Sequence, residues 1–369
     1  MNSAIDAPFA DLDLGAEPHA TGRGVTLTQS TNAQIRGEFA TVLQQSRDFN
    51  DAVEDLSAAI SWDLEGRSAV TAHGDAVLGR QCLARLHHRV RAELEAAPEK
   101  EAGRGLIASA ALLKSLVKHG VAIALRVVTR LRSGRGHGIH ATIVEEILRE
   151  LYADLVGATV WGMMRKDAYD HFVAGGLGEE LVQAIADGDH KLVVVGHSAG
   201  SIWASAMMLS AAKQPQFPKF SLILLAPAVR MEEFSVALDA SKHLIKRFRI
   251  FSMNDTLEQA DAVLGHGTGA IYPSSLLYLV SGLFEETNGK AAPDAPLLGM
   301  QRFLDRAPDW IEDAQEKAAI EKVRAFANGI ANSAIYAKAA GGEGLSTDAT
   351  AHGDFDNNVA TLSSVHSLL

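Results

Sequence analysis

The sequence predicts an α/β protein with a mostly parallel sheet covered by helices. Three short apolar runs, at residues 191–195, 220–227 and 247–253, have the length and composition of buried strands. Helical patterns separate these runs, and the clearest of them lies at residues 231–245. Because strands that alternate with helices usually pair in parallel, we expect helices on both faces of the sheet. Residues 1–130 show no convincing set of strands and predict a large N-terminal helical region.

The composition is that of an acidic globular protein. The chain of 369 residues is 47% hydrophobic, which is enough for one large core or two smaller ones. A net charge of −11 argues against a nucleic-acid partner, since no strongly basic segment balances it. The single cysteine, Cys82, excludes an internal disulfide and fits a reducing compartment. We expect a cytoplasmic protein without a membrane span, because residues 1–15 hold no apolar signal core and no uncharged apolar window reaches about 18 residues.

Three regions are expected along the chain. Residues 1–30 are rich in Gly, Ala and Asp without a clear period and predict a flexible lead. Residues 31–135 predict a helical region, and residues 136–369 predict the α/β core. Residues 106–131 are the most apolar long segment before the first strand, with basic side chains along one edge. A helix packed on the core is the favoured interpretation of this segment, and a lid or an amphipathic surface that contacts lipid is the alternative.

Further helices complete the pattern of the core. Thr142 and Glu145 have the spacing of a capping box, which predicts the start of a helix there. Residues 179–186 predict a short helix that leads into the first strand. The later elements are expected in this order: helices at 272–285 and 311–327, a loop or short strand at 341–350, and a last helix that ends at Leu369.

The first strand runs into residues 196–200 (GHSAG), a G-x-S-x-G sequence, and a helix rich in Ala and Met follows at residues 201–213. Strand, tight turn and helix is the setting in which this motif forms a nucleophile elbow. The turn strains the backbone of Ser198, and the flanking glycines remove side chains that would collide. The serine hydroxyl is thereby lifted clear of the sheet, and the Ala199 amide, at the start of the helix, can donate to an oxyanion.

A serine hydroxyl becomes a nucleophile at neutral pH when a histidine takes its proton and a carboxylate orients that histidine. In the order typical of this elbow, the acid and the histidine both follow the serine along the chain. His352, in a loop near the C-terminus, is the favoured base. Its competitors are His266, which lies between two glycines, and His366 in the last helix. His197 is a neighbour of the serine and cannot curl back onto it.

Asp255 is the favoured acid, because it follows the third strand closely and would face the elbow from the strand end. Glu258 and Asp261 compete with it from the same loop, and Asp255 could instead start a turn or cap a helix. No metal or cofactor motif competes with this chemistry: the chain has no H-E-x-x-H, no G-x-G-x-x-G that opens a strand–helix unit and no G-x-x-x-x-G-K-[ST]. We therefore expect neither a cofactor nor a metal.

The elbow, residues 195–201 (VGHSAGS), and four other segments carry a resemblance to a known family. The four others are residues 160–167 (VWGMMRKD), 271–281 (IYPSSLLYLVS), 296–300 (PLLGM) and 352–356 (HGDFD). In these segments the chain resembles a bacterial subgroup of serine hydrolases in the α/β-hydrolase superfamily, with a long helical insertion before the elbow. The resemblance covers residue 137 to the C-terminus. It implies Ser198 as the nucleophile, His352 as the base and an acid in the Asp255 loop.

The expected function is that of a serine hydrolase acting on a small-molecule carboxylic ester or related acyl substrate through an acyl-enzyme. Residues 31–135 would form a cap or lid, or a degenerate first half of the hydrolase fold. The rival expectation is a non-catalytic or degenerate hydrolase-like binding protein that keeps the triad residues but lacks a complete site. Residues 1–130 supply no strand for the loop that carries the second oxyanion donor in such hydrolases, so this donor stays unassigned.

Overall fold

A computed structural model of the protein describes residues 123, 126–127, 129–131, 133–151, 156–188, 191–263, 272–287, 290–291 and 294–369. The expected lead at 1–30, nearly all of the expected helical region at 31–135, Cys82 and His266 lie outside these residues. Among the helices of the described part, none has both the length and the apolar character needed to cross a bilayer.

Four parallel strands form the central sheet, in the order β1-β2-β3-β6. The strands are β1 Leu192–His197, β2 Phe220–Leu225, β3 Ile245–Met253 and β6 Ala334–Ala337. β1 and β2 are in register from the pair Leu192–Phe220 to the pair His197–Leu225, and β6 pairs with the last four residues of β3. Because all four strands run the same way, the loops that follow them leave the sheet at one edge.

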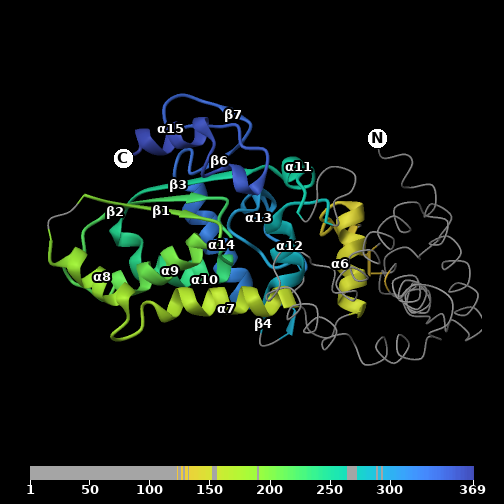
Figure 1. Ribbon diagram of the computed structural model, residues 1–369, viewed down its shortest axis with the longest axis horizontal. Coiled ribbons are helices and arrows are strands. Elements are labelled where there is room, and N and C mark those ends of the chain that lie inside the picture. The colour runs from red at the N-terminus through yellow and green to blue at the C-terminus, as the bar shows by residue number, and fades with distance from the viewer. Residues whose placement is uncertain are drawn as a thin grey trace, which may run out of the picture.

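Helices lie on both sides of this sheet, as Figure 1 shows. On one side α9 packs against β1 and contacts α7, α8 and α10, while α14 packs against α10. On the other side lies α15, which packs against β8. The predicted α/β class with a parallel sheet is therefore confirmed. These helices are α6 Ile139–Leu151, α7 Val156–Asp170, α8 Leu177–Ala186, α9 Gly200–Ala211, α10 Met231–Ser241, α14 Ala314–Asn328 and α15 Val359–Ser367.

Shorter elements fill the connections. Before β3 there is a 3-10 turn, η1 Lys242–Leu244. Between β3 and β6 lie α11 Asp255–Glu258, α12 Leu276–Leu279, the π-turn η3 Val280–Phe284, β4 Glu286–Thr287, β5 Lys290–Ala291 and α13 Gln301–Asp305. Between β6 and α15 lie β7 Ala339–Ala340, β8 Ser346–Thr347 and the 3-10 turn η4 His352–Asp354.

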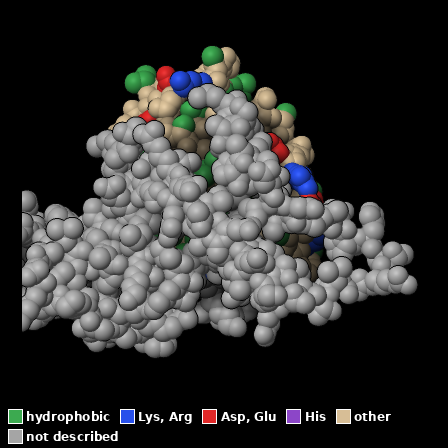
Figure 2. Space-filling view, turned by 90° about the vertical axis from the view of Figure 1, so that its right-hand side faces the viewer, with side chains coloured by type: hydrophobic (Ala, Val, Ile, Leu, Met, Phe, Trp, Pro, Cys, Tyr) green, Lys and Arg blue, Asp and Glu red, His purple; other side chains and the backbone are tan. Residues whose placement is uncertain are grey.

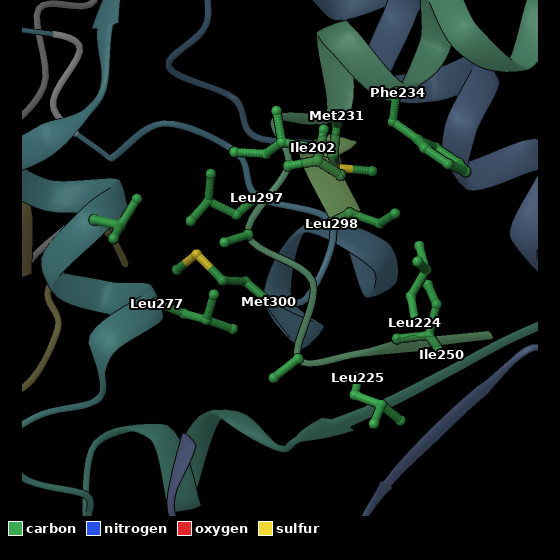
Figure 3. Close-up of a cluster of buried hydrophobic side chains, with 14 of the residues drawn as sticks. Ile202, Leu224, Leu225, Met231, Phe234, Ile250, Leu277, Leu297, Leu298 and Met300 are labelled. Atoms are coloured by element: carbon green, nitrogen blue, oxygen red, sulfur yellow. The ribbon is translucent and has the colours of Figure 1, made fainter. Parts of the chain in front are cut away.

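The core sits between the sheet and the helices around α9. β2 is buried along its whole length, as expected for a strand in the middle of a parallel sheet. In Figure 3, Ile202 of α9 and Leu298 lie above Leu224 and Ile250 of the strands, and all four side chains are almost fully buried. Burial of each such side chain contributes about 1.5–3 kcal/mol. This packing fixes α9, and with it the turn at the end of β1, on the sheet.

Two predicted boundaries are wrong, and local hydrogen bonds explain both. The expected capping box at Thr142 is absent, because α6 already begins at Ile139 and the Thr142 hydroxyl donates to the carbonyl of Gly138 at 2.6 Å. The helix predicted at 272–285 begins only at Leu276, since Ser275 caps it by accepting from the Tyr278 N–H, and it then widens into the π-turn η3.

The helix predicted at 231–245 is also shorter than expected. α10 ends at Ser241, the turn η1 follows, and Ile245 already belongs to β3. β6 is an element that the sequence pattern did not assign.

On the face shown in Figure 2, the described side chains are a mixture of hydrophobic, basic and acidic groups. The described part of that face therefore carries charges of both signs.

Candidate active site

The turn after β1 has the strain expected at the centre of G-x-S-x-G. Ser198 has a φ of 52°, in the left-handed region that side-chain-bearing residues rarely adopt. Its N–H donates to the carbonyl of Leu225 at 2.9 Å, so the end of β1 stays paired with β2 up to the serine. Gly196 is required here, because a Cβ at this position would lie 2.8 Å from the carbonyl oxygen of Gly200.

A second serine, Ser201, ties this turn to the loop after β2. Its hydroxyl donates to the carbonyl of Ser198 at 2.6 Å and accepts from the N–H of Val229 at 3.0 Å. The N–H of Ala228 also donates to the Ser198 carbonyl, at 3.2 Å. The backbone of the strained serine is thus held from both sides, although the sequence motif alone gives no sign of Ser201.

The structure brings Ser198 and His352 together. Nε2 of His352 lies 2.8 Å from Oγ of Ser198, and the imidazole is 6% exposed. Burial, and then the neighbouring His197, lower the pKa of His352 to about 4. The ring is therefore neutral at pH 7, and a neutral Nε2 can accept the serine proton.

The other ring nitrogen of His352 has no acceptor in the described part of the chain. With Nε2 accepting from Ser198, the proton of the neutral ring is assigned to Nδ1. Nδ1 is buried and finds no hydrogen-bond partner there. A buried donor without a partner costs about 1–3 kcal/mol. This nitrogen marks the position where an orienting carboxylate would act.

Asp255 is engaged elsewhere. Its two carboxylate oxygens accept from Nε and Nη2 of Arg302, at 2.7 and 2.9 Å, and one of them also accepts from the Tyr278 hydroxyl. Burial acts to raise the pKa of Asp255, but Arg302 and Tyr278 outweigh burial and lower this pKa below its usual range. Asp255 also begins α11, which Asn254 caps by accepting from the Leu257 N–H.

Asp261, the second candidate acid, binds the main chain of His352. One oxygen of its carboxylate accepts from the backbone N–H of His352 at 2.9 Å, and the other accepts from the N–H of Ala262 at 2.8 Å. Burial raises the pKa of Asp261. Glu258, the third candidate acid, is fully buried.

Ala199, the predicted oxyanion donor, lies between Ser198 and the first residue of α9. The N–H groups of Ser198 and Ser201 each donate to a backbone carbonyl, but the Ala199 N–H has no backbone acceptor in the described part of the chain. The Ala199 amide thus has the free donor that an oxyanion site needs. His366 is an exposed side chain on α15.

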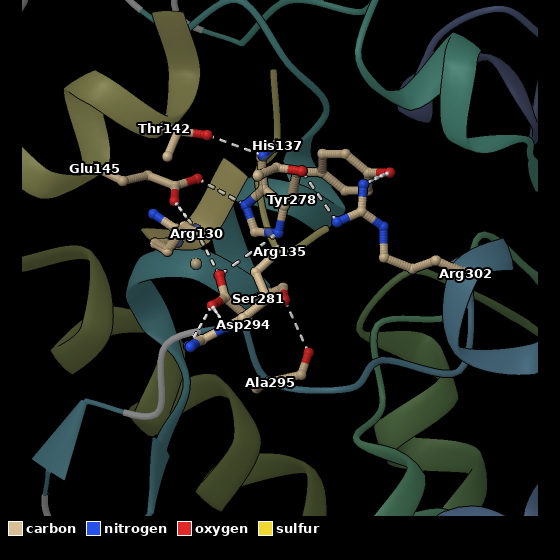
Figure 4. Close-up of polar contacts among 12 residues, drawn as sticks. Arg130, Arg135, His137, Thr142, Glu145, Tyr278, Ser281, Asp294, Ala295 and Arg302 are labelled. Atoms are coloured by element: carbon tan, nitrogen blue, oxygen red, sulfur yellow. Dashed lines mark hydrogen bonds and ion pairs between the residues drawn. The ribbon is translucent and has the colours of Figure 1, made fainter. Parts of the chain in front are cut away.

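One group of side chains in the described residues has the composition of a metal site. Ligand atoms of His137, Glu145 and Asp294 all lie within 4.8 Å of one another. Figure 4 shows Arg130 among them, and its Nη2 is 2.5 Å from both Glu145 Oε2 and Asp294 Oδ1. A guanidinium ion already supplies the positive charge that a metal would bring.

The same cluster ties distant segments to one another. His137 Nδ1 lies 2.8 Å from Glu145 Oε1, which also accepts from the Tyr272 hydroxyl at 2.6 Å. Burial acts to raise the pKa of Glu145, but His137 and Arg130 outweigh it, so the pKa lies far below the usual value. The chemistry of this donor set is that of a structural ion network.

No family model matches the sequence, and neither a curated protein nor a solved structure matches it either.

Proposed function

We propose that the protein is a serine hydrolase that cleaves a carboxylic ester or a related small acyl compound. The observation that carries this proposal is the contact of 2.8 Å between Ser198 Oγ and His352 Nε2, with the serine on a strained turn. The order of the parallel strands supports it. The serine follows β1, the candidate acids follow β3 and the histidine follows β6, which is the chain order of an α/β-hydrolase triad.

In the proposed reaction, Ser198 Oγ attacks the carbonyl carbon of the substrate while His352 Nε2 takes the hydroxyl proton. The negative charge that develops on the carbonyl oxygen is stabilised by the Ala199 N–H. His352 then gives its proton to the leaving alcohol, and an ester between Ser198 and the acyl group remains. Water, deprotonated by His352, attacks this ester and releases the carboxylic acid and the free serine.

Asp261 is the carboxylate that we assign to orient His352. It binds the main chain of the base residue, while both oxygens of Asp255 are held by Arg302. A carboxylate beside His352 stabilises the imidazolium that forms during attack. To reach His352 Nδ1, Asp261 would have to release a backbone N–H, whereas Asp255 would have to leave its charged pair with Arg302.

A fluorophosphonate probe tests the proposal, because it phosphonylates only an activated serine. We expect the full-length protein to be labelled at Ser198, with about one probe bound per chain. Ser198→Ala removes the labelling, and Ser133→Ala, at an exposed serine, keeps it. A soluble p-nitrophenyl ester should give a burst of nitrophenol that is absent from Ser198→Ala.

The second candidate function is a hydrolase-like binding protein without turnover. The observation that favours it is the missing partner of His352 Nδ1 in the described residues, which leaves the triad open. Equal absence of labelling in the wild type and in Ser198→Ala would overturn the hydrolase and favour this candidate.

A further inference from the structure

His197, the residue before the nucleophile, uses both of its ring nitrogens on the loop that carries the base. Its Nε2 lies 3.0 Å from the backbone carbonyl oxygen of His352. Its Nδ1 lies 3.5 Å from a carboxylate oxygen of Asp356. The rings of His197 and His352 are stacked, with their centroids 5.4 Å apart.

These contacts complete a hold on the main chain of the base. The N–H of His352 is bound by Asp261, and its carbonyl is bound by His197. Since the two bonds fix the backbone on both sides of Cα, they limit the positions that the imidazole can reach. A catalytic group displaced by about 1 Å can lose about a hundredfold in rate.

We propose that His197 is a positioning residue for His352, holding its backbone carbonyl through Nε2 while Asp356 engages Nδ1. The inference rests on the proposed hydrolase activity and adds a residue that does not itself touch the substrate.

His197 also bears on the proton affinity of His352. Among the described residues, the charged and titratable groups around His352 are His197 from the elbow, Asp261 from the loop after α11, and Asp354 and Asp356 from its own segment. After burial, His197 is the neighbour that lowers the pKa of His352, while Asp356 raises it. His197 therefore favours the neutral form of His352, which is the form that accepts the serine proton.

Two substitutions separate the hydrogen bond from the ring. His197→Gln places an amide N–H near the position of Nε2 without a ring, and His197→Phe keeps a ring without a donor. We expect kcat on a p-nitrophenyl ester to fall by about tenfold or more in His197→Phe and by about threefold or less in His197→Gln, with KM little changed. His243→Gln, an exposed histidine before the start of β3, is the matched control.

Asp356→Asn tests whether the carboxylate acts through His197. We expect it to reduce kcat in the wild type and to have little further effect in the His197→Gln background, so that the two changes are not additive. Additive effects would show that Asp356 acts independently of His197, and would contradict the arrangement.

A titration by NMR gives a readout that does not depend on turnover. Full-length protein with ¹³C-labelled histidine rings is titrated, and the signal of His352 is assigned by its loss in His352→Asn. We expect the titration of His352 to move to higher pH in His197→Gln and His197→Phe, because the neighbour that lowers the pKa of His352 is gone, and the acid limb of kcat/KM to move with it.

The outcomes distinguish the two proposals. An unchanged His352 titration together with an unchanged kcat in His197→Phe would overturn the role of His197. A shifted titration in a protein that the fluorophosphonate does not label would overturn the hydrolase alone, and would leave His197 as the group that positions and tunes His352.

Discussion

The carboxylate of Asp261 binds the backbone N–H of His352 at 2.9 Å, across 91 residues of sequence. Asp255, which lies closer to the end of β3, instead forms a two-pronged pair with Arg302. The carboxylate nearer to the end of β3 therefore binds Arg302 of α13, and the more distant one binds the main chain of His352.

Exchange of these two acids for asparagine should give different results. We expect Asp261→Asn to lower kcat by about tenfold to a hundredfold, because one of the two oxygens that hold the N–H groups of His352 and Ala262 is replaced by an amide donor and His352 can shift. Asp255→Asn should mainly lower stability, and only by about 1 kcal/mol or less, since the Asp255 side chain is 37% exposed and solvent screens its pair with Arg302. Steady-state kinetics and urea unfolding of both variants provide the measurement. A large loss of kcat in Asp255→Asn with a normal Asp261→Asn would assign the acid to Asp255.

Ser201→Ala should loosen the nucleophile turn. The substitution removes the hydroxyl that binds the Ser198 carbonyl and leaves the buried N–H of Val229 without its acceptor. We expect a loss of about 1–3 kcal/mol in the free energy of unfolding, together with slower phosphonylation of Ser198.

Ser205→Ala is the matched control for this change. Its hydroxyl donates only to the carbonyl of Ser201 one turn earlier in α9, so its removal leaves no backbone N–H unsatisfied. A loss below about 1 kcal/mol is expected. If the two variants were equally stable and equally reactive, the bridge through Ser201 would have no role in holding the turn.

The sequence predicted the elements that depend on local pattern. β1 and β2 are mostly apolar, and residues 250–253 at the end of β3 are buried. The strained turn at Ser198 needs Gly196, whereas a Cβ at Gly200 would meet no atom within 4 Å, so the expected collision at the second glycine is absent. β6 escaped prediction because AIYA is short and half alanine, and only its pairing with β3 makes it a strand.

Contacts between distant loops were beyond a sequence pattern. The chain order of the triad led to the pairing of Ser198 and His352, which lie 154 residues apart. The bond from His197 to the His352 carbonyl spans 155 residues, and no periodicity or motif links its two ends. The choice between Asp255 and Asp261 likewise depends on where Arg302 lies, and the sequence around Asp255 does not contain this information.

Glu258→Gln should change how stability depends on pH. Burial raises the pKa of Glu258 from 4.5 to about 8; the Ser275 hydroxyl acts against this, and the nearby carboxylates of Asp261 and Asp255 add to it. Between these two values the unfolded chain has released the proton and the folded chain still holds it. The free energy of unfolding therefore falls as pH rises through this window, by up to about 1.4 kcal/mol per pH unit.

Glutamine at position 258 does not ionise, so the variant should lose less stability than the wild type between about pH 5 and about pH 8. Urea unfolding at a series of pH values measures the difference. Glu343→Gln, at an exposed glutamate, should follow the wild-type curve. Parallel curves for Glu258→Gln and the wild type would show that Glu258 ionises normally in the folded protein.

Gly299→Ala should destabilise the segment that supports the loop after β2. The N–H of Gly299 donates to the carbonyl of Pro227 at 2.8 Å, and a Cβ at position 299 would lie 2.6 Å from that same oxygen. Because both partners are backbone, neither can turn away, and we expect a loss of about 1–3 kcal/mol in the free energy of unfolding. Gly162→Ala, at an exposed position inside α7 with nothing within 4 Å, should instead raise stability by up to about 1 kcal/mol. Urea unfolding measures the free energy of unfolding of both variants. A Gly299→Ala variant as stable as Gly162→Ala would mean that Gly299 does not contact the Pro227 carbonyl.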